Sequence, residues 1–175
     1  MAMVGLFWIA EGDVYVGAKP SGSAPGVRLT PEGVLPLGDG QPGFHLWEDV
    51  HALTVVDVPA KTLVRQVGAV KDLVLDTVLS LAMAGAPGGP YEAPALMTVR
   101  VETPDGEHEL SAHVAAAAGY SSTEVVLSRA LLSRLTEGAA TLVTTLAAMS
   151  EWGRQQDGDT PRAAEREELL RSWVG

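Results

Sequence analysis

The sequence contains no cysteine and few basic residues. Without cysteine the chain can form no disulfide, no catalytic thiol and no thiolate metal site. Its 12 lysines and arginines stand against 22 aspartates and glutamates, which gives a formal net charge of −10. Nucleic acids and anionic membranes are bound by clusters of lysine and arginine. The composition therefore predicts that the chain binds no nucleic acid and no phosphoinositide or other anionic membrane surface.

Long uncharged apolar runs are also missing. The longest apolar stretch, residues 63–86, contains Arg65, Lys71, Asp72 and Asp76, which are too many charges for a membrane span. No basic cluster follows Met1, and Glu11 and Asp13 lie where the apolar core of a secretory signal would continue. These absences, together with the lack of cysteine, predict a cytoplasmic protein.

The length and the residue pattern predict an α+β protein. With 175 residues, 46% of them hydrophobic, the chain is long enough to bury a core of its own. Residues 1–138 are rich in short β-prone runs and turn residues, whereas residues 139–175 have a helical pattern. We expect a β-rich domain over residues 1–138, and a helical C-terminal extension over residues 139–175 that packs on this domain or projects from it.

Turn residues predict three antiparallel hairpins. Glu11-Gly12-Asp13 separates apolar runs at residues 6–10 and 14–17 and supplies a tight reversal. The segments Thr-Pro-Glu-Gly (residues 30–33) and Thr-Pro-Asp-Gly (residues 103–106) each place proline and glycine as a type I turn with a following bulge requires, with positive φ at the glycine. Apolar and polar residues alternate on both sides of the second of these turns, which predicts strands with one buried face.

Four segments have the pattern of helices. Residues 61–84 carry apolar residues at three- and four-residue spacing and end in a loop rich in glycine and proline. Ser121 followed by Glu124 predicts a capping box at the start of a helix over residues 122–137. A further helix is expected over residues 141–152, and Thr160 and Pro161 predict the cap and the first position of a last helix.

One glycine motif formally matches a dinucleotide-binding fingerprint. Residues 38–43 read Gly-Asp-Gly-Gln-Pro-Gly, and Asp57 follows at a suitable distance. A pyrophosphate site needs a helix directly after the glycines, with its N-terminal amides facing the phosphates. The short stretch between Gly43 and the strand at Leu53 leaves no room for that helix, and Pro42 lacks an amide hydrogen. We therefore interpret the motif as a surface loop and predict no cofactor.

Histidines and carboxylates are the other candidates for chemistry. His45, His51, His108 and His113 show no ligand spacing, so the sequence predicts no metal site. Glu102, Asp105, Glu107 and Glu109 gather on the second hairpin, and could form a carboxylate pair or bind a hard cation. Because alternation places Glu107 and Glu109 on its solvent face, we favour a charged edge that prevents association between sheets. No Gly-x-Ser-x-Gly or Walker motif occurs, so we predict no catalytic residues and lean toward a protein that is not an enzyme.

The last helix is charged except for a few apolar residues near its end. Leu169, Leu170 and Trp173 are therefore candidate contacts with a partner. A short helix is marginal without a surface to cover, so the alternative is that it docks on its own domain. Exposure of these three side chains would favour a partner site, and burial would favour a self-contained domain.

The order of elements resembles the pleckstrin-homology-like (PH-like) fold. Strands expected at residues 5–10, 14–18, 26–30, 34–37, 46–57, 96–103 and 107–114 precede the helix at 122–137, and Leu-Trp-Glu-Asp-Val at residues 46–50 looks like the entry to the fifth strand in bacterial members. The resemblance implies a seven-stranded antiparallel sandwich or barrel with a capping helix, to which this chain adds the helix near 61–84 and the C-terminal extension. Members that bind phosphoinositides use a basic loop between the first two strands. Here that turn is Glu11-Gly12-Asp13, so no lipid-binding residue carries over.

Two functions follow from these expectations. The first is a non-enzymatic protein-interaction or scaffold module with a protein partner, because the resemblance is to a binding fold and no catalytic constellation is present. The second is a small-molecule-binding protein or an enzyme of unfamiliar type, with a pocket between the sheet and the helices beside the loop at residues 85–94. Homo-oligomerisation through the helices stays open, since no sequence marker bears on it.

Overall fold

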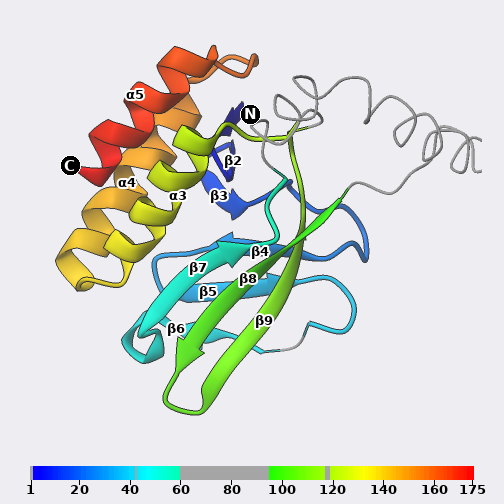
Figure 1. Cartoon of the computed structure of the whole chain (residues 1–175). Helices are drawn as coiled ribbons and strands as arrows, with labels where there is room; N and C mark the ends of the chain where they lie inside the picture. The colour runs from blue at the N-terminus through cyan, green and yellow to red at the C-terminus, as the bar shows by residue number, and fades with distance from the viewer. Residues whose placement is uncertain (1, 42, 60–94, 117–118) are drawn as a thin grey trace, which may run out of the picture.

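The computed structural model describes residues 2–41, 43–59, 95–116 and 119–175. Within them the chain forms two antiparallel β-sheets and three α-helices (Figure 1), which confirms the α+β prediction. The described strands number nine rather than seven, and neither sheet closes into a barrel through main-chain pairing of these strands. The expected helix at 61–84 and the loop at 85–94 lie outside the described residues. None of the described helices has the length and hydropathy needed to cross a membrane.

The first sheet is a meander of six strands in sequence order. Positive φ at Glu11 (54°) and Gly12 (91°) builds the tight two-residue reversal that the sequence predicts. The strand expected at residues 5–10 forms but begins at Phe7, because Gly5, with φ of 58°, turns the chain between it and an additional strand before it. The strands are β1 (Ala2–Val4), β2 (Phe7–Ala10), β3 (Asp13–Val16), β4 (Gly26–Leu29), β5 (Gly33–Leu37) and β6 (His45–Leu46).

Gly33 serves a different purpose from the one that its turn motif predicts. The turn itself forms, since the Thr30 amide donates to the Gly33 carbonyl over 2.9 Å. Gly33 does not adopt positive φ, however. A Cβ atom at this position would collide with the carbonyl of His45 on the paired strand β6. The glycine is therefore needed for the close approach of β6 and not for the turn conformation.

The second sheet contains β7 (Ala52–Val56), β8 (Leu96–Thr103) and β9 (Gly106–His113). Met97, Val99 and Val101 are buried, which confirms the predicted alternation. The strand expected over 46–57 is wrong, because a 3-10 turn, η1 (Trp47–Asp49), divides it between the two sheets. The Trp47 indole N–H donates to the Thr30 carbonyl over 2.6 Å and so fixes this corner to the first sheet.

The helices are α3 (Ser122–Leu135), α4 (Ala139–Gln155) and α5 (Ala163–Val174). Ser121 caps α3 as predicted, its side chain accepting from the Glu124 amide over 3.1 Å. The expected start of α5 at Thr160 and Pro161 is wrong, because the N-cap is Arg162. The Thr160 hydroxyl instead accepts from the Met3 amide at 3.2 Å, which holds Thr160 on β1 and away from the helix.

One continuous hydrophobic core joins both sheets and all three described helices. The helices α4 and α5 pack on β1, β2 and β3, while α3 packs on β7 and on α5 (Figure 1). At Gly153 the backbone of α4 comes so close to Ile9 that an added Cβ would overlap it. The C-terminal extension therefore lies packed on the β-rich part of the chain.

Candidate functional site

The residues proposed as partner contacts lie mostly inside the molecule. Leu170 is 0% exposed and Trp173 is 8% exposed, whereas Leu169 is partly buried. The Trp173 ring meets the Trp152 ring of α4 edge-on, with 5.8 Å between ring centroids. Leu170 and Trp173 are thus occupied by contacts within the chain. Because buried side chains cannot contact a partner, this burial favours a self-contained domain. Of the three residues, it leaves Leu169 partly accessible.

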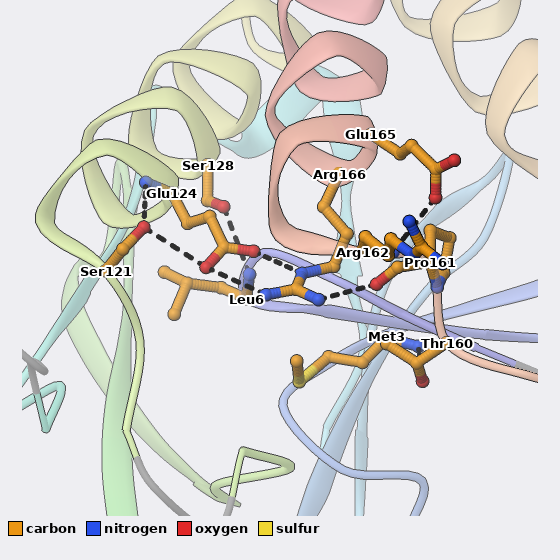
Figure 2. Close-up of polar contacts among 10 residues, drawn as sticks. All are labelled: Met3, Leu6, Ser121, Glu124, Ser128, Thr160, Pro161, Arg162, Glu165 and Arg166. Atoms are coloured by element: carbon orange, nitrogen blue, oxygen red, sulfur yellow. Dashed lines mark hydrogen bonds and ion pairs between the residues drawn. The ribbon is translucent and has the colours of Figure 1, made fainter.

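A buried ion pair also holds α5 on α3. Arg166 Nε lies 2.5 Å from Glu124 Oε1, and the two side chains are 9% and 1% exposed (Figure 2). Arg166 Nη1 donates to the Pro161 carbonyl, and the Ser121 hydroxyl donates to the Glu124 carboxylate. Charges removed from water are tolerated only when paired and hydrogen-bonded, as they are here. The Glu124 carboxylate of the predicted capping box therefore faces Arg166 and the Ser121 hydroxyl.

The pocket expected beside the loop at residues 85–94 lies outside the described residues, and a different hollow lies between the first sheet and α4. This hollow of about 360 Å³ lies between the β2–β3 and β4–β5 turns and α4, with Asp13, Arg28 and Arg154 among its lining residues. Its charged groups are paired within the chain, since Arg28 contacts Asp13 at 2.6 Å and Arg154 contacts Glu151 at 2.9 Å. This pairing leaves the pocket without a charged group directed at a ligand among the residues just named.

A different feature appears along β9, one of the two edge strands of the second sheet. The Gln41 side chain pairs with this strand as a neighbouring peptide group would: its Nε2 donates to the Ser111 carbonyl at 3.2 Å, and its Oε1 accepts from the Ser111 amide. The His113 carbonyl accepts from the Ala18 amide at 2.7 Å. The main-chain groups of Ser111 and His113 therefore point away from β8, toward the first sheet.

Main-chain direction alternates along an antiparallel strand, so Glu107 and Glu109 also point their N–H and C=O groups away from β8. Among the described residues, none makes a hydrogen bond to these four groups. We call them the open edge of β9. The open edge can accept the hydrogen bonds of one further strand.

At the other sheet margins, the described residues show single side-chain hydrogen bonds or a very short strand. Thr160 accepts from the Met3 amide of β1, and Arg129 of α3 donates to the Val55 carbonyl of β7 at 2.9 Å. At the far margin of the first sheet, β6 is only two residues long. Covering or shortening an edge is how proteins prevent unwanted strand pairing. The open edge of β9 differs in exposure, because Glu107 and Glu109 are exposed whereas Leu53 on the margin of β7 is buried.

A cleft of about 780 Å³ runs beside the open edge. Glu107, His108 and Glu109 line it from β9, while Asp39 of the β5–β6 connection and His45 of β6 line it from the other side. The His45 and His108 rings face each other with 4.7 Å between centroids. Burial, and secondarily the proximity of His108, lowers the pKa of His45 below 6.5.

Carboxylates outnumber cations at the cleft. Arg100 lies across the sheet from both glutamates, with its Nε 3.6 Å from Glu107 and 3.4 Å from Glu109. One guanidinium thus faces two carboxylates, and Asp39 adds a third carboxylate to the lining. The walls therefore favour a positively charged occupant.

Sequence reasoning missed the pairing of Gln41 with Ser111 and the contact between His45 and His108, which build this site. The glycine motif at 38–43 was interpreted as a surface loop, and its described residues connect β5 to β6. Gln41 was given no role, because its partner Ser111 lies 70 residues away. His45 and His108 come together although their spacing gave no signal. No group of three histidine, aspartate or glutamate side chains in the described ranges could hold a metal ion.

Comparison of the chain with protein-family models, with curated proteins and with solved structures gave no match.

Proposed function

We propose that this protein is a non-enzymatic interaction module that binds an extended segment of a partner protein along the open edge of β9. The observation that carries the proposal is that no hydrogen bond from the described part of the chain reaches the outward main-chain groups of Glu107 and Glu109, which lie beside a cleft of about 780 Å³. Strand addition to a sheet edge gains affinity from main-chain hydrogen bonds and specificity from the alternating side chains.

The composition supports a protein partner and a cytoplasmic location. A net charge of −10 disfavours nucleic acid and anionic membranes as ligands, and the absence of cysteine suits a reducing compartment. The protein partner and the cytoplasmic location are both part of the proposal.

We propose further that the fold is a PH-like variant. Without the two shortest strands, β1 and β6, seven described strands in two antiparallel sheets precede α3. This number and order support the resemblance, and the pairing of Gln41 with Ser111 links the two sheets where no strand closes them. The PH-like assignment and the open edge are separate proposals, since the edge follows from hydrogen bonding alone.

A library of random peptides displayed on phage tests the interaction proposal. We expect the intact protein to enrich peptides, and the enriched peptides to slow amide hydrogen exchange at Glu107 and Glu109. The variant Glu109→Pro removes one outward N–H, and Glu109→Gln removes the same charge but keeps that N–H. Enrichment should be lost in the first variant and kept in the second.

Two results would contradict the proposal. One is a library that enriches no peptide on the intact protein. The other is enriched peptides whose binding leaves the Glu107 and Glu109 amides unprotected. The exchange measurement uses the unaltered chain, so it stands even if Glu109→Pro fails to fold.

A further inference from the structure

The acidic character of the open edge suggests what kind of segment it accepts. We infer that the occupant is a short extended segment with lysine or arginine at two alternate positions, one opposite Glu107 and one opposite Glu109. This inference rests on the proposed function and adds the chemistry of the partner. It is argued from the direction of the side chains, the charge of the cleft and the place of Gln41.

Side-chain direction sets the alternate spacing. Glu107 and Glu109 are two residues apart in β9, so their side chains lie on one face of the sheet. A strand paired with the open edge places the residues directly opposite on that same face, with Cβ atoms about 5 Å away. Cationic side chains at those two positions would meet the two glutamates that share Arg100 at 3.6 and 3.4 Å.

The residue between the two cations faces a different environment. It lies opposite His108, whose side chain is on the other face of β9, where Leu110 is 6% exposed. The paired rings of His45 and His108 occupy this side of the cleft. A small or apolar side chain fits there, against these rings and the buried Leu110.

Gln41 limits the length of the segment. Its carboxamide already pairs with both main-chain groups of Ser111, so an added strand must end before that residue. The pairing region is then residues 106–109, about one short strand. A second copy of β9 is a poor occupant, because antiparallel self-pairing would set glutamates of the two copies against each other.

Three end-blocked peptides test the inference on the full chain by amide NMR titration. Their cores are Thr-Lys-Val-Lys-Thr, Thr-Glu-Val-Glu-Thr and Thr-Lys-Lys-Val-Thr, the last with the same composition as the first but with its lysines on opposite faces. We expect the first to bind about twofold to fivefold more tightly than the third, which keeps one lysine opposite a glutamate, and about threefold to tenfold more tightly than the second, which has none. Shifts should centre on the amides of residues 106–109.

A matched pair of double variants isolates the two glutamates. Glu107→Gln with Glu109→Gln should abolish the preference for the first peptide. Glu165→Gln with Glu168→Gln removes the same charge from the surface of α5 and should keep the preference. Equal binding of the three peptides at the open edge would overturn the inference and leave the proposed function standing, whereas absence of binding by all three together with an unenriched phage library would overturn both.

Discussion

Glu124 and Arg166 show how single residues decide where the C-terminal helix lies. Both side chains are buried, and their contact joins α3 to α5 across 42 positions of sequence. A buried ion pair adds little net stability compared with apolar residues of the same size, but it penalises every arrangement that separates the two charges. The pair therefore specifies the docked position of α5, with Leu170 and Trp173 turned inward.

Replacing Glu124 tests this role. Glu124→Gln leaves the Arg166 charge buried without a counter-ion, and we expect the free energy of unfolding to fall by about 3 to 5 kcal/mol. Urea denaturation followed by circular dichroism measures the change. Glu151→Gln removes one partner of the exposed pair with Arg154 and should lower the free energy of unfolding far less, because solvent screens that pair. Similar losses in the two variants would contradict a specific role for the buried pair.

His45 gives the stability a dependence on pH. In the folded protein the pKa of His45 lies below 6.5, the value expected for the unfolded chain. Between the folded pKa and 6.5, the unfolded chain therefore binds more protons than the folded one. The free energy of unfolding should therefore rise with pH through that window and gain nothing more from His45 above 6.5. We expect His45→Gln to flatten this part of the curve.

Urea denaturation of both proteins from about pH 5 to about pH 8 measures the difference. His51→Gln, at an exposed position, is the matched control. A variant curve parallel to that of the wild type across the window would show that His45 contributes nothing.

Among the elements, β9 has two halves with different environments. Its C-terminal half is tied to the first sheet through Gln41 and Ala18, while the half that contains Glu107 and Glu109 forms the open edge. At Ser111, the Gln41 carboxamide thus makes the two hydrogen bonds that a neighbouring strand would make. This division explains how the two sheets stay joined beside a cleft.

Amide hydrogen exchange by NMR tests this division directly. We expect the Glu107 and Glu109 amides to exchange rapidly, and the Ser111 amide to be protected because it donates to Gln41. In Gln41→Ala the Ser111 amide should lose its protection, while the Leu110 amide, whose N–H points toward β8, should keep it. Strong protection of Glu107 and Glu109 in the free protein would mean that the edge is covered.

For the whole molecule, the excess of negative charge acts together with the exposed edge. A net charge of −10 opposes the association of copies, and the two glutamates concentrate that effect at the site where strands could pair. The segment of opposite charge that we propose as its partner would not meet this repulsion.

Neutralising the edge should therefore promote self-association. We expect Glu107→Gln with Glu109→Gln to form dimers or larger species at lower protein concentration than the wild type, as measured by sedimentation velocity. Glu165→Gln with Glu168→Gln has the same net charge and is the control. If the two double variants associate equally, net charge alone accounts for the effect and the edge has no special part in it.

Much of the local architecture is predictable from the sequence. The reversal at Glu11 and Gly12, the alternation of Met97, Val99 and Val101, and the Ser121 cap all follow from residues within a few positions of one another. Backbone preferences and short-range hydrogen bonds act over that distance. Errors arose at Gly5, Gly33 and Thr160, where contacts with other strands or residues far along the chain decide the conformation.

The composition and these local patterns determined the class of protein, the hairpins and the functions that its charge disfavours. Only the tertiary structure decided that Gln41 meets Ser111, that His45 faces His108, and that Arg166 buries its charge against Glu124. Each pair joins segments far apart in sequence, and a periodic pattern carries no information about which distant surface a side chain will reach. The candidate site is built from such pairs, because packing of the two sheets and the helices brings their ends together.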